Sequence, residues 1–206
     1  MTTTKLDLYK EHKKEYVAPN KPTFVTVRKA TYLTIRGSGR PGGDEFQTKI
    51  AALYGVAYTL KFTWKRADKG DYAICKLEGL YWWDNEQEPT KAPIDKIRWQ
   101  LLIRTPEFIK KKQLEEAAKQ LLEKGKGEEV EQVELISLAE DRCVQMLHVG
   151  PYDKEEDTVD QMLAFATSEG FELHRRHHEI YLSDPRRVAP EKLKTILRHP
   201  VKKSGK

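Results

Sequence analysis

Glu179 is the residue of this sequence most suited to chemistry, because it interrupts a stretch of the kind that becomes buried. Ile180, Tyr181 and Leu182 follow it directly and favour a strand. An unpaired buried carboxylate is costly, so Glu179 needs either a partner or a functional role. The candidate partners are three nearby bases: Arg175, Arg176 and Lys192. If Glu179 instead faces a cleft, a partly desolvated carboxylate can attract a cation or act as a general base.

Two further residues could assist such a carboxylate. Tyr181 lies two positions after Glu179, and side chains two positions apart share one face of a strand. Glu78 is a second acid within an apolar stretch, although it could equally be a solvated charge on a strand. The candidate catalytic residues are therefore Glu179, Tyr181 and Glu78.

Aromatic side chains are numerous enough to form a binding site. The chain has nine Tyr, four Trp and six Phe, and several cluster in the run 80–83 and in the pair Tyr54 and Tyr58. Any one of these rings could simply fill the core. Several rings beside an acid favour a pocket for a flat aromatic or cationic small molecule. The candidate ligand-binding residues are Tyr54, Tyr58, Tyr81, Trp82, Trp83, Trp99, Phe108 and Tyr152.

The histidine-rich run 174–178 has no carboxylate or cysteine at firm metal-ligand spacing, so we expect a solvated basic loop there. No other motif requires a metal or an organic cofactor, and we expect none. Cys75 and Cys143 lie far apart and form no CxxC pair. Free thiols in a reducing compartment are the simplest interpretation, and we therefore expect a cytoplasmic protein.

The composition limits the classes of partner. The 206 residues include 37 Lys and Arg and 32 Asp and Glu, which are interleaved and leave a net charge of +5. Nucleic acid is therefore a weak candidate, although basic residues gather at 174–178 and 202–206. No apolar run approaches the roughly 20 residues of a membrane span, and the first residues lack the apolar segment of a secretion signal. We expect a small-molecule ligand and no membrane partner, while a protein partner stays open.

The elements that would position these residues occur in two similar sets. Residues 1–23 form a polar, Lys-rich arm before the fold. Strands are predicted by alternation of apolar and polar residues, and helices by apolar residues every three or four positions. In the first set the strands are 24–27, 30–36, 72–83 and 99–103. One helix of this set begins at Asp44, and a second helix spans about 106–124. In the second set the strands are 142–149, 179–182 and 195–198, and a helix through 159–165 ends at Gly170.

This order predicts an α+β fold made of two pseudo-repeated strand-helix-strand-strand units. The units are expected at about 24–125 and 128–200, within a single domain over 24–206. We expect the strands to form an antiparallel sheet, with the amphipathic helices on one face and a ligand cleft at the junction of the two units.

Four motifs carry a resemblance to a known family. They are Leu77-Glu78-Gly79-Leu80, Leu101-Leu102-Ile103-Arg104-Thr105-Pro106-Glu107-Phe108, Met146-Leu147-His148-Val149-Gly150-Pro151-Tyr152-Asp153 and Glu179-Ile180-Tyr181-Leu182-Ser183-Asp184-Pro185. In combination they resemble the GyrI-like small-molecule-binding proteins over nearly the whole chain. That resemblance implies two repeats around a ligand cleft. It also implies that Glu179 is the central acid, which multidrug-sensing relatives use to bind cationic drugs.

The Leu-Glu-Gly and Arg-x-Pro-Glu-Phe motifs are similar to those of a long standalone subgroup, the cyclopropanoid cyclopropyl hydrolases. Such enzymes open the cyclopropane of DNA-alkylating toxins with water inside an aromatic cage, which is a detoxifying activity. This chain departs from the subgroup at Tyr81, where a Trp is expected, and at Lys76, where an apolar residue or Pro is common. Two alternatives stay open: a protein that sequesters a drug or toxin without chemistry, and a module that masks a protein such as a topoisomerase.

Overall fold

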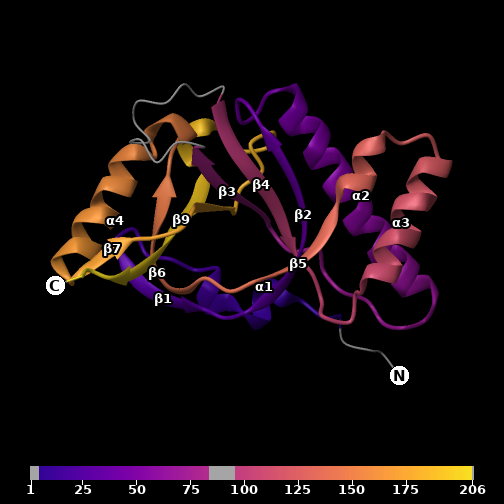
Figure 1. Ribbon diagram of the computed structural model, residues 1–206, viewed down its shortest axis with the longest axis horizontal. Helices are drawn as coiled ribbons and strands as arrows, with labels where there is room; N and C mark the ends of the chain where they lie inside the picture. Colours follow the sequence, from indigo (N-terminus) through magenta and orange to yellow (C-terminus); the bar gives the residue numbers. More distant parts are fainter. Residues whose placement is uncertain (1–4, 84–95, 206) are drawn as a thin grey trace. The chain divides into compact units, whose positions relative to one another are not determined.

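The computed structural model describes residues 5–83 and 96–205 of the chain (Figure 1). Its contacts group the chain into two compact units. Unit 1 comprises Met1–Glu11, Ala30–Cys75 and Tyr81–Leu138. Unit 2 comprises His12–Lys29, Lys76–Leu80 and Ala139–Lys206.

Unit 1 is built around β2 (Ala30–Ser38), which pairs antiparallel with β4 (Ile97–Arg104) on one side and β5 (Glu134–Leu138) on the other. The registers place Leu33 beside Ile103 of β4 and beside Leu135 of β5. β4 is buried along nearly all of its length, as its apolar run Leu101–Ile103 predicts. Residues 81–83 of β3 (Leu77–Trp83) also belong to this unit.

The helices of unit 1 are α1 (Leu8–Glu11), α2 (Asp44–Arg66) and α3 (Lys111–Glu123), followed by the short helix η4 (Glu128–Gln132). α2 packs on β2 and β4 and lies beside α3 (Figure 1). It buries one apolar face that recurs at helical spacing, formed by Phe46, Leu53, Val56, Ala57 and Leu60. Burial of this face against the sheet, rather than helix propensity, holds such a helix in place.

Unit 2 has the antiparallel strand order β1-β6-β9-β8. The strands are β1 (Thr23–Val27), β6 (Asp141–Val149), β9 (Lys194–Lys203) and β8 (His177–Tyr181), and β7 (Phe171–Leu173) pairs with the end of β9. The helices are α4 (Glu156–Ser168) and the short η1 (Lys13–Glu15), η5 (Tyr152–Lys154) and η6 (Pro190–Lys192). α4 lies against β7 and closes a core with β6 and β9 (Figure 1). That core contains Val144, Met146, Met162, Ala166, Leu197 and Val201.

The predicted α+β class with antiparallel strands is confirmed, and strand-helix-strand-strand order occurs as β2-α2-β3-β4 and as β6-α4-β8-β9, with β7 preceding β8. Two expected boundaries were wrong, and two strands were missed. Ile109 N–H donates to Pro106 O in a turn, so α3 begins only at Lys111 rather than near 106. The strand expected from Tyr72 begins at Leu77, and neither β5 nor β7 was expected. The proposed repeat boundaries and the cleft at their junction stay predictions.

The predicted arm 1–23 is partly built into unit 2, while its first four residues lie outside the described part of the chain. Tyr16 is buried, the Gln145 side chain donates to Val17 O, and Leu147 N–H donates to Pro19 O. None of the described helices is long and apolar enough to cross a membrane.

Candidate functional site

A group of polar side chains lies on one face of β8 in unit 2. His177, Glu179 and Tyr181 alternate along this strand and therefore project to the same side. The Tyr181 hydroxyl donates a hydrogen bond of 2.7 Å to Glu179 Oε2. On the other side of the carboxylate, His177 Nε2 lies 3.6 Å from Glu179 Oε1. Glu179 is thus held between a phenol and an imidazole and keeps some exposure to solvent.

A second carboxyl group reaches this cluster from the start of α4. Glu155 immediately precedes the helix, is only 9% exposed, and its Oε1 has no hydrogen-bond partner among the described residues. One ligand atom from each of Glu155, His177 and Glu179 lies within 4.8 Å of the others. The Tyr152 ring meets Tyr181 edge to face, with centroids 5.9 Å apart, and is 40% exposed. We call these five residues the acid centre.

The two acids of this centre differ in their charge. Burial, and then the negative charge of Glu179, raise the pKa of Glu155 to about 10. Glu155 therefore holds a proton at neutral pH, because two close carboxyl groups resist joint ionisation. Burial also raises the pKa of Tyr152 to about 12, and the neighbouring acids act in the same direction. A neutral acid beside a hydrogen-bonded carboxylate is an arrangement that can take up one proton and deliver another.

Sequence reasoning found only part of the acid centre. It paired Glu179 with Tyr181 but missed His177 and Glu155. The alternation that joins Glu179 to Tyr181 also reaches His177, two positions earlier, so that signal was available. Glu155 gave no local signal. We assign no metal here, since Tyr181 and His177 already contact the Glu179 carboxylate, and the expected independence from metals and cofactors stays a prediction.

Glu78 lies in a buried ion network rather than beside Glu179. It is fully buried, and its Oε1 accepts a 2.8 Å hydrogen bond from the Tyr16 hydroxyl. Its Oε2 lies 3.0 Å from His178 Nε2. His178 and Glu179 are adjacent on β8 and so point to opposite faces, which separates Glu78 from the acid centre. The candidate catalytic residues are therefore not all brought together.

His178 is the centre of that network, which corrects the expected solvated loop at 174–178. It is fully buried, and its Nδ1 lies 2.9 Å from Glu140 Oε2. Burial alone would lower its pKa, but Glu140 and Glu78 raise the pKa of His178 to about 9. Burial would raise the pKa of Glu140, but His178 and Arg198 hold it at about 2. Two cations thus neutralise two buried carboxylates, because Arg198 Nη1 lies 3.4 Å from Glu140.

The candidate aromatic residues of unit 1 divide into exposed and covered rings. Tyr54, Tyr58 and Phe62 stack along α2, with successive ring centroids 6.2 Å and 6.1 Å apart. Tyr58 and Phe62 are each nearly half exposed. Their spacing of four residues places them on one helix face, so the predicted pair Tyr54 and Tyr58 does form a continuous aromatic surface.

Trp99 is a core residue of unit 1. Its ring is fully buried, meets Phe46 edge to face at 4.9 Å, and occupies the space that a Cβ on Gly37 would need. Its Nε1 donates to Gly39 O at 3.1 Å. Tyr81 is also buried. Structural packing, the alternative that the sequence left open for each ring, therefore describes Trp99 well.

The remaining candidate rings of unit 1 are partly exposed to solvent. Trp82 and Trp83 are partly buried, and Trp83 Nε1 has no hydrogen-bond partner among the described residues. Phe108 stacks on Trp64 with centroids 4.3 Å apart and meets Tyr72 edge to face. None of these contacts by itself assigns a ligand.

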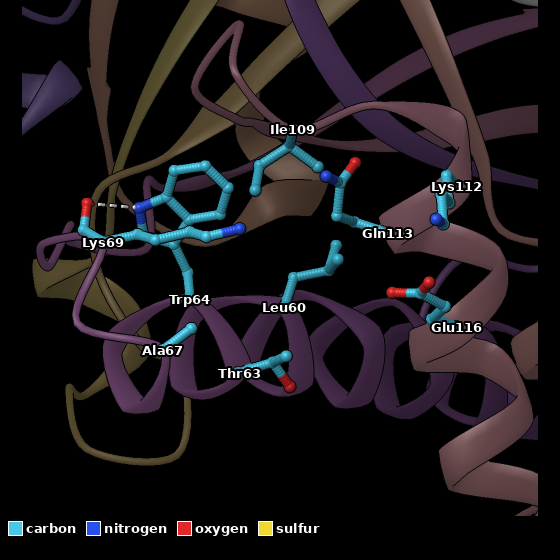
Figure 2. A pocket seen from close by; sticks show the side chains of 9 residues that line it. All are labelled: Leu60, Thr63, Trp64, Ala67, Lys69, Ile109, Lys112, Gln113 and Glu116. Carbon is cyan, nitrogen blue, oxygen red and sulfur yellow. Dashed lines mark hydrogen bonds between the residues drawn. The ribbon is translucent and has the colours of Figure 1, made fainter.

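A small pocket of about 280 Å³ lies between α2 and α3 in unit 1 (Figure 2). Trp64 forms one wall and donates through Nε1 to Lys69 O at 2.8 Å, as Figure 2 shows. The other lining residues are Leu60, Thr63, Ala67, Ile109, Lys112, Gln113 and Glu116. None of the predicted site residues lines this pocket, so it is separate from the chemistry that the sequence indicates.

Comparison with known proteins places the chain in a family. The GyrI-like small molecule binding domain matches residues 20–202. The chain belongs to this family. The resemblance inferred from the four motifs is thereby confirmed.

Two solved structures from Listeria innocua illustrate the similarity. An uncharacterized conserved protein is 37% identical, with a TM-score of 0.89, and the match covers 96% of this chain and 100% of that one. A protein described as a hydrolase is 36% identical, with a TM-score of 0.85 and the same coverage of both chains. No curated protein matches the chain.

Proposed function

We propose that this GyrI-like protein binds flat aromatic or cationic small molecules at the acid centre and hydrolyses the strained cyclopropane of DNA-alkylating toxins. One observation carries the proposal. Glu179, a partly exposed carboxylate, is held by Tyr181 at 2.7 Å and His177 at 3.6 Å, beside the protonated Glu155. The similarity to a Listeria protein described as a hydrolase supports the hydrolytic part.

In the proposed reaction, the oxygen of a water molecule bonds to the cyclopropane methylene carbon. The ring C–C bond breaks, and its electron pair passes through the conjugated system to the carbonyl oxygen, which becomes a phenolate. Glu179 takes the proton of the attacking water as general base, and the Tyr181 hydroxyl exchanges its hydrogen bond to Glu179 for one to the developing phenolate. The proton held by Glu179 then passes to the phenolate, which regenerates the carboxylate and completes the addition of one water molecule. Glu78 would act indirectly, by holding His178 beside Glu179 on β8.

The proposed ligand contacts are aromatic. Among the candidates, Tyr58, Phe108 and Tyr152 have rings exposed enough to meet a ligand directly. Tyr152 already contacts Tyr181 and so lies closest to the proposed chemistry within unit 2. A flat ligand stacked on the Tyr152 ring would be oriented relative to the Glu179 carboxylate, and a cationic one would gain from both the ring face and the charge.

The decisive experiment incubates the protein with a cyclopropane-bearing DNA alkylator and follows the alkylator by mass spectrometry. Wild type should convert it to a product heavier by one water, and Glu179→Gln should do so at least tenfold more slowly with unchanged folding. Glu172→Gln is the matched control, because that carboxylate is half exposed and pairs with Lys202 on unit 2. Equal turnover by wild type and Glu179→Gln would overturn the assignment of Glu179.

The same experiment separates hydrolysis from sequestration. The family description, small molecule binding, is compatible with a protein that holds its ligand without chemistry. Recovery of intact alkylator bound to wild type after long incubation would favour that alternative. Failure of wild type to retain or convert the alkylator would count against both, and would leave the masking of a protein such as a topoisomerase as the function to test.

A further inference from the structure

The two carboxyl groups of the acid centre have different partners, and those of Glu155 are the Thr195 hydroxyl and the Glu179 carboxyl group. Glu179 receives the Tyr181 hydroxyl, whereas Glu155 Oε1 has no hydrogen-bond partner among the residues described. Glu155 is nevertheless more than nine-tenths buried. Neither a hydroxyl nor a second carboxyl group supplies the positive charge that a buried carboxylate needs, so Glu155 must either keep a proton or gain a cation.

We propose that the Glu155 and Glu179 pair exchanges a proton for a ligand cation, so that Glu155 ionises when an organic cation binds beside Glu179. This inference rests on the proposed function of the acid centre as a ligand site. It assigns to Glu155 a role in selecting charge: the pair stores a proton when empty and presents a second negative charge only to a positive ligand. A neutral aromatic ligand would leave the proton in place.

The surroundings of Glu155 favour such an exchange. β8 presents His177 and Glu179 to it, and η5 presents Tyr152. β9 contributes the uncharged Thr195, a buried residue whose side chain interacts with Glu155. These neighbours include no lysine or arginine that would permanently neutralise a second carboxylate.

Three titratable groups lie at the margin of this arrangement. Asp184, after β8, adds negative charge near Tyr152. Lys76 donates to Leu182 O, one residue beyond Tyr181. His199 on β9 lies 5.9 Å from His177 between ring centroids, and burial lowers its pKa to about 3, so it is neutral at the pH of the test.

The number of protons released on binding follows from the charge of the ligand. In the free protein the pKa of Glu155 is about 10, so the group is mostly protonated at pH 9. An added positive charge within about 4–6 Å lowers a carboxyl pKa by roughly 1–3. Binding of a cation at pH 9 should then release roughly half to one proton per ligand. By linkage, the affinity should rise by up to about tenfold per pH unit between pH 7 and pH 9.

The test counts protons by isothermal titration calorimetry of the full chain with ethidium, a flat aromatic cation. The binding enthalpy is measured at pH 9 in two buffers of different ionisation enthalpy, which yields the protons released. Wild type should release roughly half to one proton per ethidium. Glu155→Gln should bind ethidium without releasing a proton, and its affinity for ethidium should no longer rise with pH. Glu156→Gln, which changes the adjacent exposed acid, should behave as wild type.

A second ligand keeps the test independent of any variant. Phenanthridine has the ring system of ethidium without the permanent charge, so wild type should bind it with no proton release and constant affinity from pH 7 to pH 9. Ethidium binding without proton release would overturn this inference and leave the proposed function standing. Equal release by Glu155→Gln would also overturn it, since the proton would come from another group. Absence of ethidium binding to wild type would overturn the cationic part of the proposed function and this inference together.

Discussion

Replacing Glu78 by Gln removes one of the two carboxylates that flank the buried His178 imidazolium. The pKa of His178 is raised from 6.5 to about 9 by Glu140 and Glu78, against the effect of burial. At about 1.4 kcal/mol per pH unit, that rise corresponds to about 3 kcal/mol of folding free energy. Glu140 supplies the larger part of it. We therefore expect Glu78→Gln to lower the free energy of unfolding by about 1–2 kcal/mol at neutral pH.

The pH dependence distinguishes this explanation from a simple loss of packing. A group whose pKa is raised by folding contributes stability that is complete below its unfolded pKa and is lost as the pH rises through its folded pKa. The wild-type contribution of His178 should thus be complete below pH 6.5 and disappear as the pH rises through about 9. Glu78→Gln should lose less stability between pH 6.5 and pH 9, because the variant has less stabilisation from His178 at pH 6.5.

Urea unfolding followed by circular dichroism at pH 6.5, 8 and 9.5 measures the free energy of unfolding and its dependence on pH. Glu172→Gln is the control, because its ion pair with Lys202 is about half exposed and should contribute little. Identical stability and identical pH dependence for wild type and Glu78→Gln would refute the proposed charge balance. Unchanged stability combined with loss of hydrolysis would instead restore Glu78 as a catalytic residue.

Three further predictions concern packing, the acid centre and cofactors. Gly37→Ala should lower the free energy of unfolding by about 1–3 kcal/mol, because its Cβ would collide with the Trp99 ring, whereas Gly205→Ala meets nothing and should leave urea unfolding unchanged. Tyr181→Phe removes the 2.7 Å hydrogen bond to Glu179 and should reduce alkylator hydrolysis about tenfold or more at constant stability; equal rates would remove Tyr181 from the mechanism. Hydrolysis should persist in excess chelator, and its loss on chelation would show that a metal is required.

Local pattern was sufficient for most elements of the fold. Alternation located β2 and β6, and apolar spacing located α2 and α4, because these patterns reflect one buried face per element. Short β7 carried too few residues for a period to emerge. The turn at 106–109 displaced the start of α3, since a backbone hydrogen bond there closes the chain before the helix begins.

In the acid centre too, some residues were predictable from local pattern and others were not. Glu179 and Tyr181 were predictable because a strand places alternate side chains on one face, and they form a hydrogen bond. The sequence placed Glu78 in the same set, although its charge is satisfied by His178 on the opposite face of β8. Nothing in the run 174–178 indicated that His178 would be fully buried between two acids.

The sequence by itself determined the family, the α+β class and the acid that the proposed chemistry requires, because short motifs and residue periodicity are local properties of the chain. Only the tertiary structure decided that Glu155, 24 positions before Glu179, lies beside it, and that Glu78 does not. The physical reason is that burial and charge neutralisation depend on which distant segments pack together. A carboxylate has the same letter in the sequence whether it carries a proton, pairs with a buried imidazolium or faces a ligand.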